Sequence, residues 1–216
     1  MKIVKPLQVQ AYESLKKMIL DGELSPDTIY SETKASQELG VSRTPLRDAI
    51  HRLAQEGYID VIPSKGFRLH HMTEKDLVET AQIRSALEGY CAVQLAERYE
   101  TPEAQRVFHA MESLIRDQDA IASTTGDAEE FTRYDTEFHQ RLVYSLNNSV
   151  ISETFDALHY QLRQQTYLSL LVDGRMKQTV AEHKEMLDNM KSGHVRGSYL
   201  ATLTHIGKAQ HLINLD

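Results

Sequence analysis

The sequence predicts a mainly α-helical protein of two domains: a small domain with three helices and a β-hairpin, and a larger antiparallel bundle of six helices. Apolar residues recur at helical spacing along most of the 216 residues. Alternation typical of strands is confined to residues 58–69. The charge changes as well: residues 1–71 contain 10 Lys and Arg against 9 Asp and Glu, whereas the remainder contains 14 against 22. We therefore expect domains at residues 1–71 and 72–216.

Three short helices are expected in the first domain. The first, over residues 9–20, stops at an Asp-Gly pair, and the second, over residues 31–39, stops at Gly40. The third follows Ser42, a typical N-cap residue, and ends before Gly57. One face of this third helix is apolar and should lie in the core: Leu46, Ala49, Ile50 and Leu53.

A β-hairpin is expected after these helices, with strands at residues 58–62 and 67–69 and a turn between them. Three helices followed by a two-stranded ribbon define a winged helix-turn-helix, whose third helix reads a DNA major groove. A basic solvated helix face would show the same local pattern, but the flanking elements favour DNA. The candidate DNA contacts are Ser42, Arg43, Thr44 and Arg47 on the helix and Lys65 and Gly66 at the wing tip.

The second domain shows helical periodicity throughout and no strand signals. Thr73 and Asp76 are close to the spacing of a capping box, which predicts a helix start. Six long helices of this kind form an antiparallel bundle. We expect them at about residues 73–99, 101–122, 128–146, 150–171, 175–191 and 195–215.

Four residues of the bundle form a candidate metal site. Asp135 and His139 are four residues apart, so both side chains leave the same face of one helix. His183 and His205 flank the turn at Gly193 at nearly equal distances, which puts them within roughly 3 Å of the same height. Imidazole and carboxylate ligands suit zinc, nickel, manganese or iron. The spacing of Asp135 and His139 alone fits a surface hydrogen bond or ion pair equally well.

Arg84 is the other candidate site residue. It lies with Glu88 on a helix stripe that is otherwise apolar: Leu77, Ala81, Cys91 and Leu95. A buried guanidinium needs an anionic partner. Two interpretations remain open: an ion pair with Glu88 at helical spacing, or a clamp for the carboxylate of a ligand beside the metal site.

The first domain resembles a known family. Residues 7–69, with Gly-Val-Ser-Arg-Thr-Pro-Leu-Arg-Asp-Ala at their centre, resemble the DNA-binding domain of the GntR superfamily of bacterial transcription regulators. The resemblance implies that Arg43, Thr44 and Arg47 contact operator DNA and that the wing tip enters the minor groove. Many members place an arginine where this chain has Thr33. The neighbouring Lys34 points about 100° away on a helix, so the chain departs from the family pattern there.

The second domain, from Thr73 to Leu215, resembles the FCD ligand-binding domain of the FadR-type branch. Many members of that branch hold a metal with an aspartate and three histidines in the order found here, and the pairs Phe138-His139 and Glu182-His183 match too. Members that bind a fatty acyl thioester instead lack the histidines. The resemblance therefore implies a divalent metal, with zinc expected first, and it also assigns Arg84 to the effector.

Together these features predict a cytoplasmic, homodimeric repressor whose operator binding is modulated by a small organic acid. Two alternatives remain: a sensor for which the ion is the signal, and a metal-dependent enzyme with Glu182 or Glu137 as base. A lone cysteine excludes an intramolecular disulfide, and no apolar run has the length of a membrane span. The remaining acidic and histidine candidates are expected at the surface or around the site: Glu137, Glu182, His109, His159, His194 and His211.

Overall fold

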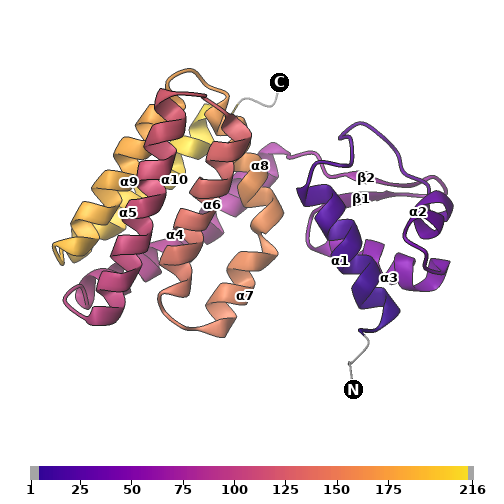
Figure 1. Cartoon of the computed structure of the whole chain (residues 1–216), viewed down its shortest axis with the longest axis horizontal. Helices are drawn as coiled ribbons and strands as arrows, with labels where there is room; N and C mark the ends of the chain where they lie inside the picture. Colours follow the sequence, from indigo (N-terminus) through magenta and orange to yellow (C-terminus); the bar gives the residue numbers. More distant parts are fainter. Residues whose placement is uncertain (1–4, 214–216) are drawn as a thin grey trace. The chain divides into compact units, whose positions relative to one another are not determined.

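The computed structural model describes residues 5–213, and its chain divides into two compact units, Met1–His71 and Met72–Asp216. The first unit contains three helices and one antiparallel hairpin. The second is entirely helical over the residues described. This confirms the predicted fold class, a winged helix-turn-helix followed by a helical bundle (Figure 1).

The first unit is built from α1 (Leu7–Leu20), α2 (Glu32–Glu38), α3 (Arg43–Gln55), β1 (Ile59–Ile62) and β2 (Gly66–Leu69). Helices α1 and α3 pack against each other and enclose the core. The apolar face predicted for α3 is confirmed, because all four of its residues are buried: Leu46, Ala49, Ile50 and Leu53. The polar face of α3 is thereby left at the surface.

The hairpin is held against the segment before α2. Strand β1 pairs with β2 from Ile59 opposite Leu69 to Ile62 opposite Gly66, and Tyr30 adds one bridge to Phe67. Gly66 has a φ of +133°, and a Cβ there would lie 2.0 Å from the carbonyl oxygen of Tyr30. Position 66 therefore has no room for a side chain, because the backbone of Tyr30 lies against it. The sequence did not indicate this constraint.

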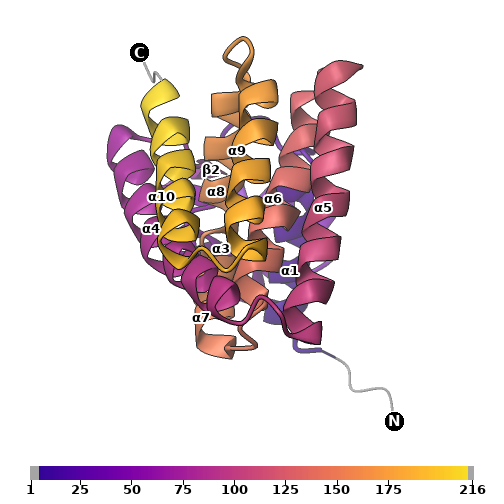
Figure 2. The same cartoon turned by 90° about the vertical axis from the view of Figure 1, so that its left-hand side faces the viewer.

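The bundle contains α4 (Glu74–Glu97), α5 (Pro102–Ser123), α6 (Ala128–Tyr144), α7 (Ser149–Ala157), α8 (His159–Leu170), α9 (Arg175–Lys191) and α10 (Val195–Leu212). Helices α4 and α10 lie side by side, and α5 packs against both α6 and α9 (Figure 2). The capping box predicted at Thr73 and Asp76 is present. The end expected for the last helix, at residue 215, lies outside the described residues.

One expected helix, over residues 150–171, is two helices in the structure. The chain turns at Leu158, whose backbone has ψ of 2° and whose N–H bonds to Phe155 O, three residues earlier. Neither glycine nor proline marks this break, and the apolar spacing continues through it from Ile151 to Leu162. The bundle therefore has seven helices among the described residues, one more than expected.

The predicted buried stripe of α4 is also confirmed, since Arg84 and Glu88 are buried together with their apolar neighbours. Cys91 on this stripe is fully buried, and burial raises the pKa of its thiol to about 12. None of the helices between residues 5 and 213 has both the length and the apolar character needed to cross a membrane.

Candidate functional site

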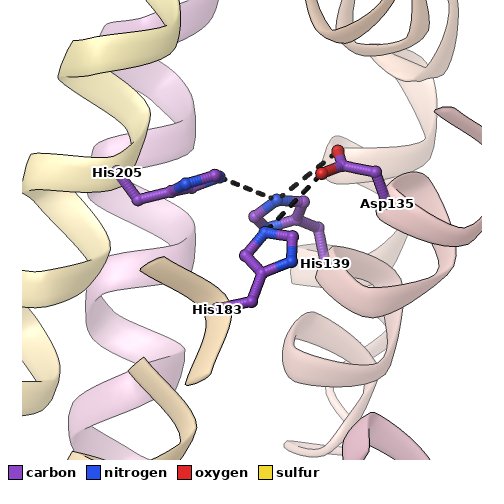
Figure 3. Close-up of side chains that lie close together, drawn as sticks. All are labelled: Asp135, His139, His183 and His205. Carbon is purple, nitrogen blue, oxygen red and sulfur yellow. Dashed lines mark hydrogen bonds and ion pairs between the residues drawn. The ribbon is translucent and has the colours of Figure 1, made fainter. Parts of the chain in front are cut away.

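Four residues predicted as metal ligands lie together in the interior of the bundle (Figure 3). Asp135 and His139 come from α6, one turn apart, while His183 comes from α9 and His205 from α10. All four are at most 3% exposed. Each offers one ligand atom, and these atoms all lie within 4.8 Å of one another. Three separate helices thus converge on a single point.

The distances between ligand atoms fit a single ion. The Nε2 atoms of His139 and His205 are 3.2 Å apart, and Asp135 carboxylate oxygens lie 3.7 Å from His139 Nε2 and 3.6 Å from His183 Nε2. Neighbouring ligands at about 2.0–2.1 Å from an ion are separated by about 2.9 Å around an octahedral ion and by about 3.3 Å around a tetrahedral one. His183 Nε2 is buried and has no hydrogen-bond partner among the described residues. These donors therefore fit a divalent metal.

The outer nitrogen of each imidazole contacts an acceptor. His205 Nδ1 lies 2.7 Å from Glu182 and His183 Nδ1 lies 2.9 Å from Gln118. His139 Nδ1 lies 2.7 Å from a carboxylate oxygen of Glu88. A proton held on Nδ1 leaves the lone pair of Nε2 free, which is the tautomer that binds a metal.

Two further contacts fix the orientation of the ligands. Thr166 of α8 donates its hydroxyl hydrogen bond to Asp135 at 3.1 Å. The ring of Phe138 stacks on that of His183 with centroids 4.0 Å apart and planes 13° apart. Both contacts restrict side-chain rotation, so the site is largely preformed.

Buried ion pairs hold the two acidic acceptors. Arg84 donates from Nε to Glu88 at 2.6 Å, and Arg175 donates two hydrogen bonds to Glu182, each of 2.7 Å. Burial alone would raise the pKa of Glu88, but Arg84 and His139 outweigh it and lower the pKa. Burial opposes ionisation of Glu182 too, yet hydrogen bonds from His205 and Arg175 lower its pKa to about 2. Both carboxylates are thus ionised near neutral pH.

The histidines have the opposite response to burial. Burial lowers the pKa of His183 well below its usual value, and the nearby imidazoles add to this effect. Burial also lowers the pKa of His205, although the hydrogen bond to Glu182 opposes the change. Neutral imidazoles are the form that ligates a metal.

The ion pair expected between Arg84 and Glu88 is present, but only the Nε of Arg84 takes part. Within residues 5–213, its two terminal guanidinium nitrogens have no hydrogen bond. Glu182, considered as a base, is occupied by Arg175 and His205, while Glu137 is half-exposed and pairs with Arg141 at 2.7 Å. Neither glutamate is a free base beside the ligand cluster.

Several residues around the cluster carry no motif in the sequence. Gln118 and Thr166 reach it from α5 and α8, and Arg175 acts through Glu182. Two of the surrounding residues had a local signal: Glu182 adjoins His183 and matched the family context, and Glu88 lies with Arg84 on an otherwise apolar stripe. The contacts of Gln118 and Thr166 come from helices that are distant in sequence, so spacing could not reveal them, whereas Arg175 and Glu182 lie seven residues apart on α9.

The candidate DNA contacts of the first unit are at the start of α3 and at the hairpin turn. Arg43, Thr44 and Arg47 are exposed, as is Lys65. Ser42 has the extended backbone of an N-cap, but its side chain makes no capping hydrogen bond. Its hydroxyl is therefore not committed to the helix end, unlike that of Thr73, which caps α4.

The chain combines a winged three-helix unit with a helical bundle that contains a buried cluster of possible metal-binding side chains. This architecture is typical of bacterial transcription regulators with a ligand-binding domain. Residues 7–69 match the family described as bacterial regulatory proteins, gntR family, and residues 79–208 match the FCD domain. The chain belongs to the GntR family, in its FadR-type branch with a C-terminal FCD domain. The family and the fold indicate a transcription regulator rather than an enzyme.

Relatives of similar length support this assignment. The chain is 27% identical over 208 residues to the uncharacterized HTH-type transcriptional regulator YdhC of Bacillus subtilis, covering 96% of this chain and 91% of that protein. It is 28% identical over 175 residues to the gluconate operon transcriptional repressor of Bacillus licheniformis, covering 81% and 69% of the two chains.

The fold is shared with solved structures at lower identity. A GntR regulator from Rhodococcus sp. RHA1 superposes with a TM-score of 0.75 at 21% identity, covering 94% of this chain and 95% of that one. The Escherichia coli protein McbR/YncC gives a TM-score of 0.69 at 20% identity, with the same coverage. These similarities concern the fold alone.

Proposed function

We propose that this GntR-family regulator is a homodimeric repressor whose operator binding is modulated by a small organic acid, bound at a divalent metal in the FCD domain. In this proposal residues 1–71 bind DNA and residues 72–216 bind the metal and the effector. The observation that carries it is the convergence of Asp135, His139, His183 and His205, with ligand atoms within 4.8 Å of one another. Relatives named as repressors support the direction of regulation.

The charge of the site favours an acid. Three neutral imidazoles and one ionised carboxylate would leave a divalent ion with a net charge of +1. A metal such as zinc would supply a Lewis-acid centre, and an octahedral ion held by four side chains keeps two positions for a chelating ligand. The terminal nitrogens of Arg84 would bind the carboxylate as a fork, since only its Nε is used by Glu88.

The DNA contacts are assigned to exposed side chains of α3 and the wing. Arg43, Thr44 and Arg47 would reach base edges and phosphates, with Ser42 at the helix start. Lys65 would contact a phosphate, beside Gly66. A dimer would place two such units on a palindrome.

Replacing the arginine in the second turn of α3 tests the DNA assignment. Arg47→Ala should weaken binding to the operator by about 1–3 kcal/mol, because one base contact is lost. Fluorescence anisotropy on the full-length protein measures this. Arg133→Ala removes an exposed arginine of α6 and serves as the control. Equal operator affinity of the Arg47 variant and the natural protein would remove Arg47 from the interface.

Removing two imidazoles tests the metal site. The double variant His183→Ala with His205→Ala should lose stoichiometric metal, because only two of four ligands remain. Elemental analysis of purified protein gives the occupancy. The matched control replaces two exposed histidines, His109 and His211, and should keep full occupancy. A fully loaded variant lacking His183 and His205 would place the metal elsewhere.

Measuring DNA binding and metal content together distinguishes regulation by an acid effector from regulation by the metal itself. If an acid is the signal, the protein keeps its metal in both the DNA-bound and the released state, and release follows addition of hydroxy- or dicarboxylic acids. Anisotropy with citrate, malate and gluconate, combined with elemental analysis of both states, measures this. DNA binding that is switched reversibly by the ion alone would assign the signal to the metal.

Replacing the guanidinium of Arg84 with an ammonium group tests the role of this residue. Arg84→Lys keeps the positive charge beside Glu88 but offers a single point of contact. We expect unchanged metal content and operator affinity, with an effector response shifted by about tenfold to a hundredfold. Arg175→Lys makes the same change in the pair with Glu182 and is the control. An unaltered dose-response curve for Arg84→Lys would reduce this arginine to the partner of Glu88.

A further inference from the structure

Both arginines at the start of α3 contact the first turn of α2. Arg47 donates from Nε and Nη2 to one oxygen of Glu32, at 3.2 and 3.0 Å. Arg43 donates from Nη2 to the hydroxyl of Thr33 at 2.6 Å. Arg43 and Arg47 are four residues apart, so they share one face of α3, and their two partners are consecutive residues of α2. A pair of residues on one helix thus holds a pair on the next.

These contacts use only some of the N–H donors of each guanidinium group. Arg47 uses Nε and one Nη, so Nη1 has no hydrogen bond in the part of the chain that the structure describes. The side chain of Arg47 is 58% exposed, whereas that of Glu32 is 21% exposed. The carboxylate is therefore largely covered, and the remaining donors of Arg47 are at the surface.

A carboxylate at this place has two opposite effects on DNA binding. It lowers attraction to phosphates, because it neutralises a cation that would otherwise pair with the backbone. It also restricts the rotamers of Arg47, so less entropy is lost when that arginine meets a base edge. The first effect weakens binding to any sequence, and the second strengthens binding only where the correct base is present.

We infer that Glu32 and Thr33 are positioning residues that set operator specificity, by orienting Arg47 and Arg43 toward base edges and reducing their use on phosphates. The inference rests on the DNA-contacting role proposed for these arginines. It also assigns a role to Thr33, where many family members have an arginine. In this chain the hydroxyl of Thr33 accepts a hydrogen bond from Arg43, whereas an arginine at this position would add another cation to the surface.

Removal of the carboxylate charge tests the inference. The full-length protein is measured on two duplexes of equal composition, one selected by the protein from a random library and one scrambled. Glu32→Gln should bind the scrambled duplex about two- to fivefold more tightly, the range of one exposed ion pair, with a salt dependence steeper by about one ion. The ratio of selected to scrambled affinity should fall by a similar factor.

The matched control is Glu38→Gln. Glu38 lies on the same helix and pairs with Lys34 at 3.8 Å, with no hydrogen bond or ion pair to Arg43 or Arg47 in the described chain. This variant makes the same change in net charge, so we expect equal changes on both duplexes and an unchanged ratio. A purely structural role of Glu32 at the start of α2 would likewise change both affinities equally. Equal changes on both duplexes in Glu32→Gln, with an unchanged ratio of affinities, would therefore overturn the inference.

A double-mutant cycle shows whether Glu32 acts through Arg47. In the Arg47→Ala background, Glu32→Gln should leave the ratio of affinities unchanged, and a persisting effect on the ratio would contradict the inference. If Arg47→Ala alone leaves operator binding intact, the DNA assignment of Arg47 fails and the inference fails with it. If Arg47→Ala weakens binding while Glu32→Gln behaves as Glu38→Gln, only the positioning role is lost.

Thr33→Val gives a second, independent arm. It removes the hydroxyl that accepts from Arg43 and keeps the shape of the side chain. We expect a lower ratio of selected to scrambled affinity without the steeper salt dependence, since no charge is changed. An unchanged ratio would remove Thr33 from the inference.

Discussion

Buried polar contacts restrict how the helices of the bundle are arranged. Three carboxylates, of Glu88, Asp135 and Glu182, are almost fully buried among α4, α6 and α9. An unpaired charge in such a place costs several kcal/mol, so each needs a partner with good geometry. The charged partners Arg84 and Arg175 lie on the same helices as Glu88 and Glu182. The imidazoles that contact these carboxylates come from other helices: His139 of α6 contacts Glu88 of α4, and His205 of α10 contacts Glu182 of α9. Sliding one helix by a turn would separate the imidazoles from these carboxylates, so buried polar contacts restrict the helix register together with apolar packing.

The two units use polar contacts in different ways. In the bundle, the carboxylates of Glu88 and Glu182 are buried and orient the imidazoles that contact them, while burial itself lowers the pKa of His183 and His205. In the winged unit, the contacts of Arg43 and Arg47 are at the surface, so in the proposed complex these arginines can keep their protein partners and use their remaining donors on DNA. A preformed interior is suited to recognising one small ligand, whereas loosely held surface cations are suited to a long polyanion.

How far the sequence could predict this structure depends on the range of each interaction. The face of α3, the capping box at Thr73 and the spacing of Asp135 and His139 follow from contacts within one helix, and all three were predictable. The convergence of His183 with His205 needed only the turn at Gly193. In contrast, the turn at Leu158 has no local signal, and contacts such as that of Gln118 with His183 span 65 residues. Those depend on how whole helices pack.

Cys91, buried on the inner stripe of α4, has a practical consequence for experiments. A thiol reacts as its thiolate and needs access to the reagent, and this one has a pKa raised to about 12 and no exposed surface. We therefore expect that maleimide reagents do not label Cys91 in the folded natural chain. A substitution such as Asp48→Cys on the exposed side of α3 would introduce the single reactive sulfur of the described chain. In the proposed dimer, fluorophores or spin labels attached there would report the spacing of the two winged units on DNA without any background to subtract.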